Sequence, residues 1–191
     1  MAFLKKIRKV SPGKYLSKYE LTYETSGGRE KVYEMVSHNP ELSPINIGQE
    51  QTGIVLLVFD PSHEHMLLGI EFRMGVNAYI VNNISGFIDP GETPQQAAAR
   101  ELKEETGLEL SKVLDVLPFA YTCAPVTDMS TALIVCEATG ELTVSENPNE
   151  DIVPAWYSRE ELSGLLKLGC KFSGRTQAFA YMWCRENRQE E

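Results

Sequence analysis

Long apolar runs are absent from this chain. Its longest uninterrupted apolar stretch is Ile54–Phe59, whereas a helix that crosses a bilayer needs about 20 such residues. The N-terminal sequence MAFLKKIRK is basic and lacks the apolar core of a secretory signal. We therefore expect a cytoplasmic protein with no membrane partner.

Paired cysteines and excess positive charge are also missing. The chain has four cysteines, and no two of them show the C-x-x-C spacing of zinc sites or redox pairs, so we expect reduced thiols. Lysine and arginine total 18 against 27 aspartates and glutamates, which gives a formal net charge of −9. A nucleic-acid groove needs a basic stripe, so this balance argues against a nucleic-acid partner. It suits a protein that recruits cations to handle an anionic substrate.

A dense motif is present at Gly86–Leu108, and its second half predicts a helix. Thr93 is a good N-cap, Pro94 suits the first helical position, and Gln96 completes a capping box. Three consecutive alanines follow, which have the highest helix propensity. Gly107 is the expected stop just past the helix end.

Three glutamates share one face of this predicted helix. At 3.6 residues per turn, Glu101, Glu104 and Glu105 fall within an arc of about 100°. Like charges about 4 Å apart cost about 1 kcal/mol per pair in water and several-fold more near a protein surface. A solvated glutamate face is the alternative interpretation. The pattern favours a divalent cation bound at this face.

The segment resembles the Nudix box, G-x5-E-x7-R-E-U-x-E-E-x-G-U with U aliphatic, at every fixed position. The matching residues are Gly86, Glu92, Arg100, Glu101, Leu102, Glu104, Glu105, Gly107 and Leu108. The resemblance implies hydrolysis of a nucleoside diphosphate linked to another moiety, with Mg²⁺ or Mn²⁺ as cofactor. It also implies an α+β fold of the Nudix type, an α/β/α sandwich with a mixed sheet between helices.

The resemblance implies a role for each residue of the box. Glu101 and Glu105 would be the strongest metal ligands, with Glu104 and the carbonyl of Ser85 in support. Glu104 would also take part in catalysis, and Arg100 would assist by holding a glutamate carboxylate through charge-assisted hydrogen bonds. Three residues would have structural roles in the motif, namely Gly86, Glu92 and Gly107.

Outside the box, the chain resembles the ADP-ribose pyrophosphatase branch. That branch carries an N-terminal strand domain that exchanges across a homodimer, and residues 1–48 look like one. Glu71-Phe72-Arg73 is similar to a motif before its box, and Arg73 would contact phosphates. The segment Cys123–Asp128 is similar to its S-P-G-x-x-[DE] loop, which would place Pro125 and Asp128 at the substrate.

Two further positions bear on catalysis and specificity. Residues 147–152 are similar to the acidic loop of that branch, and Glu150 would activate or orient the attacking water. The branch usually reads E-L-P-A-G up to the first box glycine, whereas here Asn82 replaces the glutamate. Loss of that acid could change the substrate, weaken a metal site, or shift work to Asp128 or Glu150. Taken singly, Arg73, Pro125 and Glu150 could also be ordinary surface or turn residues.

The remaining pattern divides the chain into two expected domains, 1–48 and 49–191. Strands are predicted at 15–25, 31–36, 52–59, 66–72, 78–84, 113–122, 131–138 and 151–157. A capping box, Ser158 with Glu161, opens a further helix, and an amphipathic helix lies within 172–186. Residues 1–18 carry six basic residues and no acid. We expect a solvated, partly mobile segment there, or an arm that favours anionic substrate at a subunit boundary.

The sequence therefore predicts a metal-dependent hydrolase of a nucleoside diphosphate sugar, with ADP-ribose as the preferred substrate and a homodimer as the assembly. Other sugar nucleotides, such as GDP-mannose or UDP-glucose, stay open as substrates. A ligand sensor without catalysis is a further alternative, although the box acids are intact. A role in RNA decapping or RNA binding is disfavoured by the acidic balance.

Overall fold

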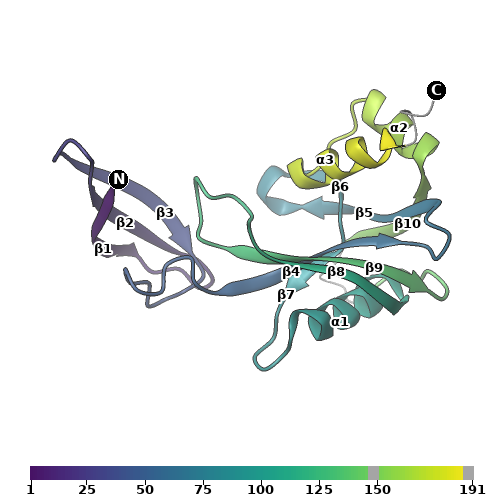
Figure 1. Ribbon diagram of the computed structural model, residues 1–191, viewed down its shortest axis with the longest axis horizontal. Coiled ribbons are helices and arrows are strands. Elements are labelled where there is room, and N and C mark those ends of the chain that lie inside the picture. Colours follow the sequence, from purple (N-terminus) through teal and green to yellow (C-terminus); the bar gives the residue numbers. More distant parts are fainter. Residues whose placement is uncertain (146–150, 187–191) are drawn as a thin grey trace. The chain divides into compact units, whose positions relative to one another are not determined.

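Figure 1 shows the computed structural model, which describes residues 1–145 and 151–186. The chain forms two compact units, residues 1–53 with 118–132 and residues 54–117 with 133–191. The first unit thus includes the expected N-terminal domain together with a segment from much later in the chain.

The first unit is built on an antiparallel sheet with the order β1-β2-β3, formed by Phe3–Ser11, Ser17–Glu24 and Glu30–Ser37. The turn between the last two strands contains Gly28, which has a φ of 71°. A small core of Tyr19, Leu21, Met35 and Leu42 lies against this sheet. The segment after β3 takes part in the packing, because the Tyr19 hydroxyl donates to the Asn39 carbonyl at 2.8 Å.

Most of the basic N-terminal segment forms the strand β1, whose backbone is paired with β2 and whose side chains are mostly exposed, in agreement with the expected solvation. Two of its cations are paired with acids of the neighbouring strand β2. Lys5 Nζ lies 3.0 Å from a Glu24 oxygen, and Arg8 is hydrogen-bonded to Glu20. Such exposed pairs contribute little each, and backbone pairing with β2 supplies the order. The charges of Lys5 and Arg8 are therefore balanced within the sheet.

A hairpin tip, residues 118–132, completes the first unit. The Val36 amide donates to the Val126 carbonyl at 2.9 Å, and the Tyr33 hydroxyl donates to the Pro125 carbonyl at 2.5 Å. The tip connects β8 (Glu109–Tyr121) with β9 (Ser130–Thr139). The loop that contains Pro125 is thus held against β3 by hydrogen bonds.

The second unit contains most of a mixed sheet whose main order is β10-β5-β4-β9-β8, with β6 beside β5 and β7 beside β4. The strands not yet given are β4 (Gln51–Phe59), β5 (His65–Arg73), β6 (Ala78–Asn82), β7 (Ser85–Phe87) and β10 (Ile152–Ser158). A 3-10 turn, η1 (Met74–Val76), joins β5 to β6. At the centre of the sheet, Ile54, Leu56 and Val58 of β4 are fully buried.

Helices cover both faces of this sheet within the second unit. Figure 1 shows α1 (Pro94–Thr106) on one face, and α2 (Arg159–Lys167) and α3 (Gly174–Trp183) on the other. The expected sandwich is therefore confirmed. One cluster of the core joins Met66 and Leu68 of β5 to Leu162 of α2 and Ala180 of α3. None of the helices in the described residues is long and apolar enough to span a membrane.

The helix ends follow the predicted signals. Thr93 and Gln96 form the reciprocal capping box of α1, and Ser158 and Glu161 form that of α2. Gly107 ends α1 in the left-handed conformation, with a φ of 74°. Ala97, Ala98 and Leu102 are buried on the inner face of α1. This burial fixes which face of the helix remains for the glutamates.

Candidate active site

Arg100 of α1 holds the acidic residues of the motif together. Its Nε and Nη2 donate to the two oxygens of Glu92, each at 2.9 Å, and Nη2 also donates to the Phe87 carbonyl at 2.9 Å. Its Nη1 donates to Glu101 at 2.8 Å and to Glu104 at 3.2 Å. One guanidinium therefore ties the loop before the helix to two glutamates on the helix.

The ion pairs of this hub shift the pKa values of its members. The Arg100 hydrogen bond, followed by the Asp89 amide that also donates to the carboxylate, lowers the pKa of Glu92 below its ordinary value. The Glu92 carboxylate is also the main cause that raises the pKa of the Arg100 guanidinium. Both groups are therefore charged over the whole physiological range.

Gly86 makes room for a glutamate of the helix. A Cβ placed on Gly86 would lie 2.0 Å from the carboxyl carbon of Glu101. Gly86 does not adopt a positive φ, so the requirement for glycine here is one of space. The strand β7, which contains Gly86, thus passes directly against the carboxylate that Arg100 holds.

A small cavity of about 140 Å³ brings residues from separate segments together. Ser85 comes from β7, Glu105 from α1, and Glu71 and Arg73 from β5. Phe72, Asp151 and Ile152 complete the lining. Carboxylates and a guanidinium at one hollow can serve a cation and an anion at once, which is the requirement for a metal-bound phosphate.

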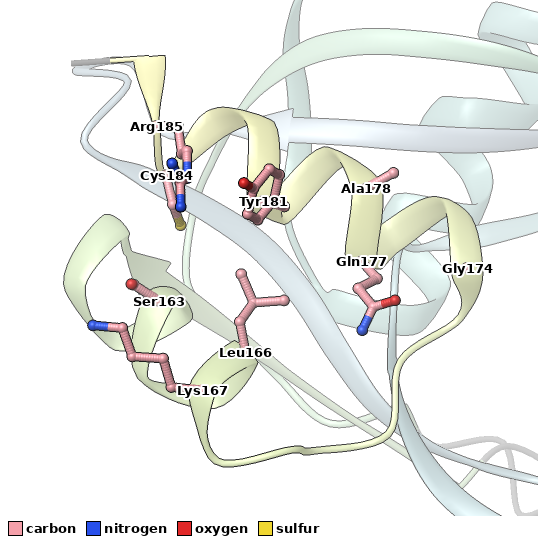
Figure 2. A pocket seen from close by; sticks show the side chains of 9 residues that line it. All are labelled: Ser163, Leu166, Lys167, Gly174, Gln177, Ala178, Tyr181, Cys184 and Arg185. Atoms are coloured by element: carbon pink, nitrogen blue, oxygen red, sulfur yellow. The ribbon is translucent and has the colours of Figure 1, made fainter. Parts of the chain in front are cut away.

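A larger cavity of about 490 Å³ lies between α2 and α3 (Figure 2). Leu166 of α2 and Tyr181 of α3 project toward this hollow in Figure 2, and Lys167 and Arg185 stand at its rim. None of the residues that line it belongs to the glutamate motif. We place the candidate site at the smaller polar cavity, because its lining contains carboxylates and a guanidinium that suit a metal-bound phosphate.

A comparison with known families settles the membership of the chain. The family described as the NUDIX domain matches this chain over residues 49–176, about two thirds of the sequence. The chain belongs to the NUDIX domain family. The matched range contains the whole glutamate motif and the cavity beside it.

Individual relatives of this NUDIX chain share about 30% of its residues over the matched regions. The ADP-sugar pyrophosphatase of Mus musculus is 29% identical over 141 residues, which is 74% of this chain and 60% of that protein. The NAD-capped RNA hydrolase NUDT12 of Homo sapiens is 31% identical over 129 residues, 66% of this chain and 25% of that protein. The chain thus spans between a quarter and three fifths of the length of these relatives.

The fold has a solved counterpart. The crystal structure of an ADP compounds hydrolase superposes with a TM-score of 0.71 and covers 97% of this chain and 92% of that chain, at 22% sequence identity. At this level of identity, the likeness establishes the fold of the NUDIX chain. It agrees with the layered arrangement described above.

The donors at the site fit a hard divalent cation. Within residues 1–145 and 151–186, no three acidic, histidine or cysteine side chains converge closely enough to hold a metal by themselves. Glu101 and Glu104 are turned to Arg100, while Glu105 and Ser85 line the polar cavity. Oxygen ligands from few carboxylates, completed by water and substrate phosphate, are what Mg²⁺ accepts.

Asn82 is buried beside this cavity and is bound to Glu71. Its Nδ2 donates to Glu71 Oε1 at 2.5 Å, and its Oδ1 lies 3.1 Å from the Thr176 hydroxyl. The same Glu71 oxygen accepts from Arg73 Nε at 2.6 Å. A glutamate at position 82 would have no hydrogen to donate and would oppose the Glu71 carboxylate. The amide at this position is thus matched to an acid on the neighbouring strand.

The other predicted substrate residues lie elsewhere in the chain. Pro125 and Asp128 belong to the first unit, where the Gly48 amide lies 3.5 Å from an Asp128 oxygen. Asp128 also lines a cavity of about 250 Å³ within that unit, together with residues of the 37–52 segment. Glu150 lies outside the described residues. The second unit therefore assembles Arg73, Asn82, Ser85 and the box glutamates.

Two residues at the cavity were not predicted as site residues. Glu71 accepts hydrogen bonds from both Asn82 and Arg73, and Asp151 accepts one from the Tyr79 hydroxyl at 2.5 Å. That bond raises the pKa of Tyr79 above its ordinary value. The alternation of β5 was the available signal for Glu71, because residues 71 and 73 point to the same face of a strand.

Proposed function

We propose that this protein hydrolyses the pyrophosphate bond of a nucleoside diphosphate sugar, and that ADP-ribose, giving AMP and ribose 5-phosphate, is the preferred substrate. One observation carries the proposal: Glu105 of the box and Ser85, just before the box, share a polar cavity with Arg73 of β5. Cation ligands and a phosphate-binding guanidinium at one hollow suit a metal-bound diphosphate. The name of the mouse relative, ADP-sugar pyrophosphatase, supports this class of substrate.

In this proposal, Glu101, Glu104, Glu105 and the carbonyl of Ser85 hold Mg²⁺ or Mn²⁺. A bound divalent ion lowers the pKa of a water and neutralises charge on phosphate oxygens. Arg100 is a positioning residue, because its contacts are with Glu92, Glu101 and Glu104. Glu150 is the carboxylate that we assign to orienting or activating the attacking water.

The proposal assigns substrate contacts residue by residue. Arg73 binds phosphate oxygens, and Glu71 fixes the direction of its guanidinium. Asn82 supports this pair through its hydrogen bond to Glu71. Pro125 and Asp128 are proposed to contact the substrate, and residues 1–48 to form a homodimer. Light scattering on the purified protein measures that assembly directly.

A substrate panel tests the proposed reaction. ADP-ribose, GDP-mannose, UDP-glucose and an NAD-capped RNA oligonucleotide are each incubated with Mg²⁺ or Mn²⁺, and the products are separated by chromatography. We expect AMP and ribose 5-phosphate from ADP-ribose, no product in EDTA, and the highest kcat/KM for that substrate. A higher kcat/KM for another compound of the panel would identify that compound as the preferred substrate instead of ADP-ribose. Tight binding of ADP-ribose without any turnover would instead identify a sensor.

A further inference from the structure

Arg175, in the first turn of α3, occupies an unusual position for a cation. The start of this helix is fixed to the end of β6, since the Ser173 amide donates to the Val81 carbonyl at 3.1 Å. The next residue, Thr176, contacts the side chain of Asn82, which in turn is bound to Glu71. Arg175 thus directly precedes the residue that joins α3 to the Asn82–Glu71 pair, and Arg73 and Glu71 are the charged groups that act on its guanidinium.

The environment of Arg175 does not favour its charge in the absence of a ligand. Its Nε is buried and has no hydrogen-bond partner among the described residues. Burial lowers the pKa of its guanidinium, the neighbouring Arg73 lowers it further, and Glu71 acts in the opposite direction. The first turn of a helix also disfavours cations, because its dipole is positive there. Three separate features therefore oppose a positive charge at this point.

A bound anion would stabilise the positive charge of the Arg175 guanidinium against these three effects. Glu71 supplies one negative charge, and its Oε1 already accepts from both Arg73 and Asn82. Among the groups that act on the charge of Arg175, an arginine and a single carboxylate stand beside it, while Glu105 and Asp151 also line the cavity. A phosphate oxygen would give the buried Nε–H an acceptor, and guanidinium forks match phosphate geometry.

We propose that Arg175 is a second phosphate-binding residue, which clamps the diphosphate of the substrate together with Arg73. This inference rests on the proposed function, because it names the partner of that same site. It assigns the specificity for a doubly charged diphosphate to a residue of the C-terminal helix. Residues beyond the box on α3 then contribute directly to substrate affinity.

The test compares Arg175→Gln and Arg175→Lys with the control Arg185→Gln. Arg185 is a matched arginine beyond the far end of the same helix, exposed and stacked on Tyr181. Binding of inorganic pyrophosphate in EDTA is followed by ³¹P NMR, kcat and KM are measured with ADP-ribose and Mg²⁺, and Tm is measured without ligand.

We expect Arg175→Gln to weaken pyrophosphate binding and to lower kcat/KM by roughly 10- to 100-fold, mainly through KM. Arg175→Lys should recover part of this loss, because it keeps the charge without the fork. The Tm of Arg175→Gln should equal or exceed that of the wild type, and Arg185→Gln should behave as wild type throughout.

Two results would overturn the inference. One is unchanged pyrophosphate binding in Arg175→Gln, and the other is a Tm that falls by several degrees in both Arg175 variants, which would make the residue structural. The proposed function fails separately. A wild-type protein that binds pyrophosphate through Arg175 but hydrolyses none of the nucleotide sugars would leave the anion clamp standing and remove the reaction.

Discussion

The carboxylate of Glu101 occupies the space that any side chain on Gly86 would need. A Cβ at position 86 would lie 2.0 Å from the Glu101 carboxyl carbon and 2.0 Å from one of its oxygens. Real contacts of this kind are never so short, so one of the two must move. The position of the Glu101 carboxylate therefore requires a glycine at position 86.

Gly86→Ala should abolish most activity while the chain remains folded. The methyl group would push the Glu101 carboxylate from its place, and a misplacement of about 1 Å at a catalytic group can cost about 100-fold in rate. We expect that loss in kcat with ADP-ribose. Gly164→Ala is the control, because a Cβ there meets nothing within 4 Å and alanine favours helix α2. Similar activity in the two variants would contradict the steric argument.

Glu105→Gln should remove most of the turnover and leave the fold intact. The substitution keeps the shape of the side chain at the cavity but removes its charge. Loss of a partner behind a metal ligand already costs about 10- to 100-fold, so loss of the ligand itself should cost roughly 100-fold or more. Titration of activity with Mg²⁺ measures this effect. Glu109→Gln, an exposed acid just past the motif, should retain wild-type values.

Stability should fall in acid because of Glu92. Its pKa is lowered in the folded state by Arg100, so the native protein favours the ionised form more than the unfolded chain does. The resulting stabilisation is present above the ordinary pKa of glutamate and is lost as the pH falls through the folded pKa. Urea melts between pH 7 and pH 3 should show this loss.

The variant Glu92→Gln isolates that effect. It should be less stable than the wild type at pH 7, and the gap between the two should narrow as the pH falls. The exposed Glu64→Gln variant should follow the wild type at every pH. A gap for Glu92→Gln that is constant with pH would show that the carboxylate charge contributes nothing to folding.

Glu150→Gln should lower turnover strongly and leave metal affinity unchanged. This outcome follows if the carboxylate orients or activates water and does not ligate the metal. The dependence of kcat on Mn²⁺ concentration separates the two roles, and Glu146→Gln in the same segment is the matched control. A mild effect on kcat would move the role of base to another acid, with Asp151 at the cavity as the first candidate.

Local signals predicted α1 and its caps with accuracy. Thr93, Gln96 and Gly107 act within a few residues of their own positions, so their effect could be read without knowledge of the rest of the fold. The strand β1 was missed for the opposite reason. Its basic residues show no alternation of their own, and Lys5 and Arg8 find their partners only when β2 is placed beside them.

Contacts at the cavity could not be predicted from the sequence either, because the partners lie on different elements of the fold. Asn82 was recognised as a departure from the family pattern, but its partner Glu71 stands on another strand, 11 positions earlier. Nothing in the spacing indicated that Thr176, 94 positions later, would reach the same amide. Pro125 was predicted as a substrate-binding residue from the family resemblance. The hydrogen bond that its carbonyl accepts from Tyr33 was not predicted.

The sequence by itself determined a capped helix with three glutamates on one face, because helical hydrogen bonds join residues only four apart. Tertiary structure decided what meets that face and the cavity beside it. The Gly86 backbone against Glu101, the Glu71–Arg73–Asn82 group, and the buried Arg175 all depend on strands and helices that are distant in sequence. Such contacts follow from the order of the sheet, which no local spacing encodes.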